Sequence, residues 1–144
     1  MTGVQTCALP IYLPEILDES YDSLIWDALS RNCFSCGTCN LVCPTCYCFD
    51  VREVVEMNLL EGRRERRWDG CMLQNFAEVA GGENFREHKA DRLRHRIFRK
   101  GKYMREMFGK SGCVGCGRCD RHCTAGISIQ QICKQLATQA STAS

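Results

Sequence analysis

The sequence predicts a mostly α-helical domain that is organised around two cysteine-rich loops. Apolar residues recur at helical spacing along segments 13–30, 84–108 and 128–138, which is the pattern of helices that bury one face. The same cysteine spacing occurs twice, with a segment of different character inserted between the two occurrences. The chain has 144 residues, a length typical of one domain with a modest core.

The helices before the basic region are expected to be short. Segment 13–30 alternates acidic and apolar residues, which predicts one or two helices with Ser20 as a candidate N-cap. Segment 72–79 is also predicted to be helical, and Gly81 and Gly82 are expected to end it.

Two further helices are expected towards the C-terminus. A long basic helix is predicted to start at Glu83 or Asn84 and to run to about Phe108, where Gly109 ends it. A final helix is predicted over 128–138. Its inward-facing residues are expected to be Ile129, Ile132 and Leu136.

The inserted segment 47–68 carries two patterns that conflict. Four apolar residues fall at helical spacing, namely Val51, Val54, Val55 and Leu59. The aromatic and β-branched content of the same segment suits a pair of strands. Gly62 marks a turn in either case, so the sequence predicts a short helix or a strand pair here.

Eight cysteines form two runs with the same C-x2-C-x2-C-x3-C spacing. The first run comprises Cys33, Cys36, Cys39 and Cys43, and the second comprises Cys113, Cys116, Cys119 and Cys123. This spacing is typical of bacterial ferredoxins that hold 4Fe–4S clusters. Three cysteines at this spacing can bind three corners of one cubane. Gly37 and Gly117 follow the second cysteine of each run, where a missing Cβ lets the backbone approach inorganic sulfur.

The signature also predicts how the eight thiols are shared, because the fourth cysteine of each run ligates the other cluster. Cluster one is expected to take Cys33, Cys36, Cys39 and Cys123. Cluster two is expected to take Cys113, Cys116, Cys119 and Cys43. The predicted cofactors are therefore two 4Fe–4S clusters, and the predicted chemistry is electron transfer without a catalytic residue in this chain.

Disulfides and zinc are the two alternative uses of so many thiols. A disulfide framework requires an oxidising compartment, and the count of 13 cysteines is odd. A zinc ribbon could combine Cys33 and Cys36 with Cys113 and Cys116, but it would leave the other four thiols of the two runs unused.

Other residues outside the two runs are candidates for function. Cys46, Cys48 and Cys71 could form a possible extra metal site or a redox pair, or could simply pack in the core. Cys133 lies among apolar residues and is expected to be inert. The basic stretch 86–110 is expected to balance cluster charge and to dock another protein of a complex, and nucleic acid is not an expected partner.

The two ends of the chain are expected to lie outside the domain. Residues 1–11 resemble a translated sequencing adapter, so this segment and its Cys7 are excluded from the fold and the natural protein is expected to extend further upstream. The dicluster domain is predicted over 12–140, and 141–144 are expected to be a disordered tail.

The composition indicates the cellular compartment in which the protein works. No apolar run approaches the roughly 18 residues that a membrane span needs. Thiols that must stay reduced to bind metal favour a cytoplasmic location. The net charge of +2 does not include the negative charge that bound clusters would add.

Several motifs together resemble a known family. In chain order they read CGTCNLVCPTCYCFDV, RRWDGCM, FAEVAGGENFR, RLRHRIFRK and CVGCGRCDRHC. They are similar to the iron–sulfur subunit family that is shared by sulfhydrogenases, as their beta subunit, and by anaerobic sulfite reductases. The resemblance implies an α-helical ferredoxin-like dicluster domain with an inserted segment between the two motifs. Thr124 departs from the proline that often follows the last cysteine of a ferredoxin motif.

The resemblance also implies partners. The chain would relay electrons between the catalytic subunit of a hydrogenase or a sulfite reductase and a flavin-containing NAD(P)H-oxidoreductase subunit. Two alternatives belong to other classes of protein. One is a catalytic subunit like heterodisulfide reductase, with a special cluster at Cys46, Cys48 and Cys71. The other is a zinc-dependent module that binds nucleic acid through the basic helix.

Overall fold

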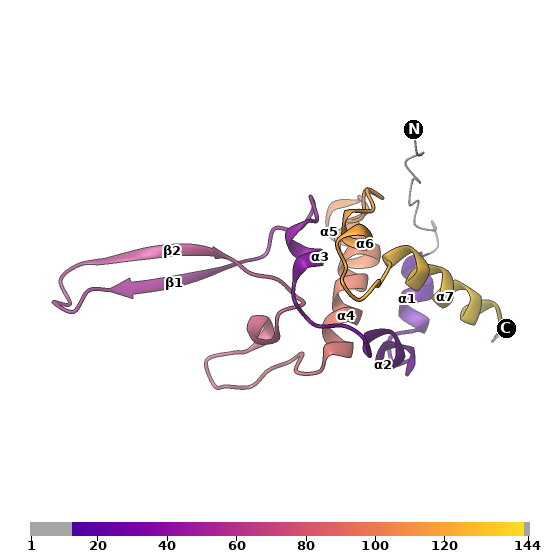
Figure 1. Cartoon of the computed structure of the whole chain (residues 1–144), viewed down its shortest axis with the longest axis horizontal. Helices are drawn as coiled ribbons and strands as arrows, with labels where there is room; N and C mark the ends of the chain where they lie inside the picture. The colour runs from indigo at the N-terminus through magenta and orange to yellow at the C-terminus, as the bar shows by residue number, and fades with distance from the viewer. Residues whose placement is uncertain (1–12, 143–144) are drawn as a thin grey trace.

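The computed structural model describes residues 13–142, which form a helical body from which one long arm projects (Figure 1). The adapter-like segment 1–11 with its Cys7 lies outside the described residues, as do residues 143–144 of the predicted tail. None of the described helices is long and apolar enough to cross a membrane.

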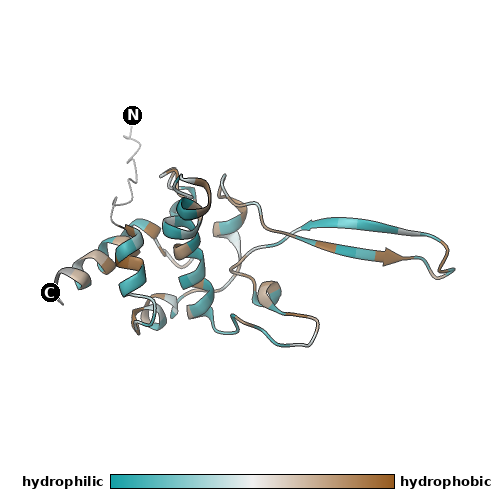
Figure 2. Ribbon diagram, turned by 180° about the vertical axis from the view of Figure 1, so that it is seen from behind, coloured by the Kyte–Doolittle hydropathy of each residue, from teal (hydrophilic) through white to brown (hydrophobic). Residues whose placement is uncertain are grey.

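The arm is an antiparallel hairpin of strand β1 (Phe49–Val55) and strand β2 (Gly62–Trp68). The prediction of a mostly α-helical, α-helical ferredoxin-like fold is therefore wrong, and the chain is a small mixed α/β protein. Of the two predictions for the inserted segment, the strand pair is confirmed. Hydrophilic residues dominate β2, whereas β1 carries hydrophobic patches (Figure 2).

The helical pattern in the arm has a simple physical origin. Val51 and Val55 are four residues apart, and such positions share a face in a strand as well as in a helix. Cross-strand pairing favours the strands, because Phe49 lies opposite Trp68 in the register of the hairpin and aromatic residues that face each other across strands stabilise a sheet.

The body packs four helices around one apolar core. They are α1 (Leu13–Glu19), α2 (Ile25–Ser30), α4 (Lys89–Phe98) and α7 (Ile129–Thr142). Among the buried core residues are Leu17, Trp26, Met72, Leu93, Ile97, Phe98, Ile129, Ile132 and Leu136. The inward face predicted for the last helix is thus confirmed. The prediction of Ser20 as a helix N-cap is wrong. Its N–H donates to the Ile16 carbonyl at 3.1 Å, so Ser20 follows the C-terminal end of α1.

The predicted basic helix is a rod with an irregular centre. After α4 the chain forms a π-helical segment, η2 (Arg99–Tyr103), and then α5 (Met104–Phe108). Gly109 ends the rod with a φ of 68°, as predicted. The start lies later than expected, because His88 is extended and the helix begins only after it.

The π-helical segment allows α1 to approach the rod closely. A Cβ on Gly101 would lie 2.8 Å from Leu13 Cδ2 and 2.8 Å from Leu17 Cδ1, which is too close for any side chain. Any other residue at this position would therefore force the buried Leu13 and Leu17 side chains to move.

Three short helices complete the fold. They are α3 (Thr38–Leu41), η1 (Gln74–Ala77) and α6 (Arg118–Arg121). The helix predicted over 72–79 is only the single 3-10 turn of η1. α3 and α6 contact each other, and this contact brings the two cysteine runs together beside the middle of the rod, at Arg96 and Lys100.

Candidate metal centre

The two cysteine runs fold into the same local structure. Gly37 and Gly117 adopt φ angles of 74° and 65°, in the left-handed region that favours Gly. Each Gly precedes one short helix, and its carbonyl accepts the first helical hydrogen bond, from Asn40 N at 2.8 Å and from Arg121 N at 3.1 Å. The sequence predicted special glycines at these two positions, and the structure explains them by this turn.

The first cavity, here the Cys43 cavity, gathers thiols from both runs. Its thiol-bearing residues are Cys43, Cys113, Cys116 and Cys119. These are the four residues that the sequence predicted for cluster two. Lys100 and Ile129 also line this cavity.

The second cavity, here the Cys123 cavity, lies in the apolar core. Its thiol-bearing residues are Cys33, Cys39, Cys119 and Cys123. Its apolar lining includes Met72, Leu93, Ile97, Ile127 and Ile132. Cys36, which the sequence predicted for cluster one, is exposed and does not line this cavity. Hydrogen bonds with Thr38 lower the pKa of the Cys36 thiol.

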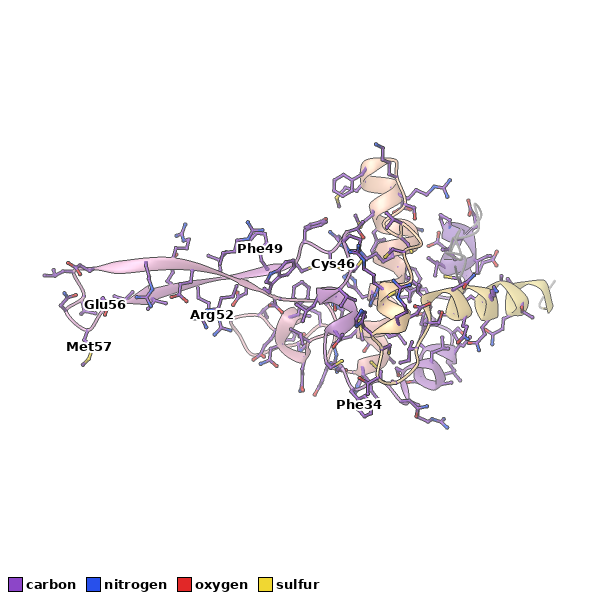
Figure 3. The ribbon with its side chains drawn as sticks, turned by 45° about the horizontal axis from the view of Figure 1, so that its top comes forward. Phe34, Cys46, Phe49, Arg52, Glu56 and Met57 are labelled. Carbon is purple, nitrogen blue, oxygen red and sulfur yellow. The ribbon has the colours of Figure 1, made fainter. Side chains whose placement is uncertain are left out.

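The third cavity, here the Cys71 cavity, contains the thiols that were predicted as a possible extra site. Its thiol-bearing residues are Cys46, Cys48 and Cys71. Cys46 lies where the arm joins the body (Figure 3). The buried Asn40 amide donates to Cys71 Sγ at 3.3 Å and to Cys46 Sγ at 3.7 Å. Between residues 13 and 142, no three Cys, His, Asp or Glu side chains are arranged to hold a single metal ion.

Two buried cations lie between these cavities. Arg96 and Lys100 are 4% and 3% exposed, and Arg96 lines all three cavities. Its Nε donates to Cys39 Sγ at 3.0 Å and its Nη2 donates to the Cys39 carbonyl at 3.0 Å. Lys100 Nζ donates to Thr45 Oγ1 at 2.6 Å. Arg96 and Lys100, at the centre of the rod, therefore face inward and not towards solvent.

The buried charge of Arg96 indicates whether anionic clusters would fit the thiol cavities. Its Nη1 has no hydrogen-bond partner among the described residues, and a buried cation is costly unless an anion lies nearby. Burial disfavours the guanidinium charge, but the neighbouring thiols, chiefly Cys39, outweigh this effect and raise the pKa of Arg96. Clusters with thiolate ligands would supply the missing negative charge, so the residues present fit such cofactors.

The thiols themselves differ in acidity. Burial raises the pKa of Cys113, and it raises the pKa of Cys119 to about 12. A hydrogen bond from Cys46 lowers the pKa of Cys43 to about 4. Iron binds thiolates, so iron in the Cys43 cavity would require that Cys113 and Cys119 release protons, and its affinity would fall as the pH falls.

Backbone N–H groups orient two of the thiols. Ser35 N donates to Cys33 Sγ at 3.4 Å, and Ile127 N donates to Cys123 Sγ at 3.3 Å. Asp120 holds the second run against α7, because its carboxylate accepts from Ser128 Oγ at 2.6 Å and from Ile129 N at 3.2 Å. Donors that point at sulfur are a usual means of tuning iron–sulfur centres.

Sequence reasoning expected the basic stretch 86–110 to balance cluster charge, but it did not single out Arg96 and Lys100, and it missed Asn40 as a part of this centre. One signal was present for the cations: Arg92, Arg96 and Lys100 are spaced by four residues, so they share one face of a helix. All three are buried. No pattern around Asn40 pointed to the distant Cys71.

Comparisons with known proteins agree with this geometry. Residues 32–127 match a family described as a 4Fe–4S dicluster domain. The chain is 42% identical over 115 residues to the sulfhydrogenase 2 subunit beta of Pyrococcus furiosus, a match that covers 80% of this chain and 34% of that relative. The chain thus spans about a third of the length of this relative. No solved structure matches the chain. The predicted resemblance to sulfhydrogenase beta subunits is confirmed.

Proposed function

Because the chain belongs to the 4Fe–4S dicluster domain family, we propose that it is an electron-transfer domain that binds two 4Fe–4S clusters. The observation that carries this proposal is that each fourth cysteine shares a cavity with thiols of the opposite run. Cys43 lies with three thiols of the second run, and Cys123 lies with Cys33 and Cys39 of the first.

The proposed ligand sets are crossed between the runs. Cluster one takes Cys33, Cys36, Cys39 and Cys123. Cluster two takes Cys113, Cys116, Cys119 and Cys43. Exposed Cys36 would complete cluster one from its solvent side, and its lowered pKa favours the thiolate that iron needs.

Bound clusters would supply one-electron reduction and oxidation. The residues of the chain exclude water and set the charge around them. Arg96, Cys119 and Ile129 line both cavities, so the two sites share a wall. The positive charge of Arg96 and Lys100 stabilises the more negative, reduced state of a nearby cluster.

The proposed role is that of a relay in a larger complex. The relative from Pyrococcus furiosus is a subunit of a sulfhydrogenase, which supports a hydrogenase-type assembly. Electrons would enter from a flavin-containing NAD(P)H-oxidoreductase subunit, then leave to the catalytic subunit of a hydrogenase or a sulfite reductase. The chain itself would be a non-catalytic subunit, and its reduced thiols suit the cytoplasm.

Anaerobic reconstitution tests the number of clusters. Two clusters require at least about eight iron atoms and about eight inorganic sulfides per chain, and low-temperature EPR of the reduced protein should show two interacting centres. A colourless chain that holds zinc, or a chain that holds clearly less than about eight iron atoms, would contradict the proposal.

Pairs of cysteine substitutions test the crossing. Cys43→Ala combined with Cys116→Ala should remove one cluster only, because both ligands serve cluster two. Cys43→Ala combined with Cys36→Ala should remove both clusters. The reverse result would show that each run holds its own cluster. Cys133→Ala is the matched control, since Cys133 is buried in α7 and lines none of the three cavities.

A further inference from the structure

The Cys71 cavity joins two parts of the chain that are distant in sequence. Cys46 and Cys48 follow the first run, and Cys71 follows β2. The hairpin returns the chain to its starting point, because Phe49 pairs with Trp68 and Asp69 N donates to the Cys48 carbonyl at 3.4 Å. The base of the arm therefore fixes the position of Cys71 relative to the other two thiols.

Asn40 gives this cavity a built polar wall. The side chain is 4% exposed, and its amide donates to Cys71 and Cys46. Its Oδ1 has no hydrogen-bond partner among the described residues. A Cβ on Gly70 would lie 3.1 Å from Asn40 Cγ and Oδ1, so a glycine beside Cys71 lets the amide reach the thiols. Donation of N–H groups to sulfur stabilises thiolates over thiols.

The charge in this cavity is one-sided. Arg96, Arg99 and Lys100 line it, and no carboxylate of the described residues does. Arg96 and Lys100 are almost fully buried, so a nearby negative charge would stabilise them. Three neutral thiols would not provide it, whereas three thiolates bound to a metal cluster would.

We propose that Cys46, Cys48 and Cys71 bind a third iron–sulfur cluster. A single ion needs its ligands close around one atom, whereas a cluster spreads three thiolates over three iron atoms. One iron then has no protein ligand and takes a non-protein one. The proposal rests on the proposed function for its setting, because Arg96 lines this cavity and both cavities of the two-cluster relay.

Native mass spectrometry of anaerobically produced protein, with iron and sulfide analysis, tests the third site. We expect about twelve iron atoms in the wild-type chain and about eight in Cys71→Ala, with the two interacting EPR centres retained in the variant. Cys48→Ala should also lower the iron content to about eight atoms, and it serves as the test if Cys71→Ala fails to fold. The control Cys133→Ala should keep about twelve.

Three other outcomes of these measurements would contradict a third cluster. About eight iron atoms in the wild-type chain, unchanged in Cys48→Ala and Cys71→Ala, would overturn the third site and leave the two-cluster function standing. A disulfide between two of these three cysteines in the iron-loaded protein would overturn it as well. A wild-type chain that lacks even about eight iron atoms would contradict both proposals.

Discussion

The guanidinium of Arg96 lies between the thiol cavities and is bonded to one of the proposed ligands. Its Nε is 3.0 Å from Cys39 Sγ, and no carboxylate among the described residues pairs with it. A hydrogen bond to a charged group contributes about 1.5–3 kcal/mol. A side chain of this kind is expected to tune the reduction potential of the cluster for which Cys39 is a proposed ligand.

Arg96→Gln should make the reduction potential of cluster one more negative, on the order of 50–100 mV. The cause is the loss of a positive charge that stabilises the reduced cluster. Anaerobic redox titration followed by EPR measures the shift, and Arg96→Lys should shift the potential less because the charge remains.

Arg105→Gln is the matched control, because it removes the same charge from an exposed position on the same rod. If Arg96→Gln and Arg105→Gln give equal potentials in protein with a full iron content, Arg96 does not tune the cluster.

His95 should make the stability of the body depend on pH. Burial, together with Arg86 and Arg99, lowers the pKa of His95 to about 4, whereas an ordinary histidine titrates near 6.5. Between these values the unfolded chain binds a proton that the folded chain does not bind. The stability contributed by neutral His95 is therefore complete above about pH 6.5 and is lost as the pH falls towards about 4.

The test compares thermal unfolding of wild type and His95→Gln between about pH 5 and about pH 7. The His95→Gln variant should lose less stability than wild type on acidification. Any acid sensitivity of the clusters is common to both proteins, so it cancels when their stabilities are compared at the same pH. His88→Gln replaces an exposed histidine at the start of α4 and should behave as wild type. Parallel curves for all three proteins would show that His95 does not carry the effect.

At the scale of elements, the arm is separable from the body. The strands β1 and β2 pack chiefly on each other, and their ion pairs, such as Arg64 with Glu53 at 2.5 Å, lie on an exposed surface. Such pairs contribute little stability. Glu56 and Met57 lie at the far tip of the arm (Figure 3), and the Met57 side chain is fully exposed.

Replacing 52–65 by a short Gly-Ser turn should therefore leave the iron content of the body unchanged and shift its Tm by less than about 4 °C. The replacement keeps the base of the arm, where Phe49 pairs with Trp68, and so keeps Cys48 and Cys71 in place. Iron analysis and thermal unfolding measure the outcome. Loss of iron on shortening would mean that the distal part of the arm braces the metal centre.

At the scale of the whole molecule, the metal centre is part of the core. Cys33, Cys39, Cys113 and Cys119 pack against the apolar cluster formed by the helices. Crossed ligands would clamp together two runs that lie 80 residues apart in the sequence, which limits the freedom of the unfolded chain.

Removal of iron should therefore abolish cooperative unfolding of the body. Chelation under anaerobic conditions, followed by near-UV circular dichroism and calorimetry, measures this. Far-UV helical signal should survive in part, because α4 and α7 have strong apolar faces. An iron-free chain with an unchanged calorimetric transition would show that the clusters do not contribute to the stability of the fold.

Local patterns were predictable wherever a short stretch of sequence sufficed. The spacing of the eight cysteines indicated the type of cofactor, because ligands on a helical turn are placed by neighbours three residues away. The inward face of α7 and the end of the rod at Gly109 followed from the same kind of local rule. Segment 47–68 was ambiguous because Val51 and Val55 satisfy a helix and a strand equally well.

The sequence by itself thus determined that this protein is built around two ferredoxin-type cysteine runs of the 4Fe–4S dicluster family. Only the tertiary structure decided that the centre of the basic rod points inward, and that the hairpin returns Cys71 to Asn40 and Cys46. The physical reason is that ligand spacing is set by the local geometry of a few residues. The partner of a buried charge or a distant thiol is set by how remote segments pack against one another.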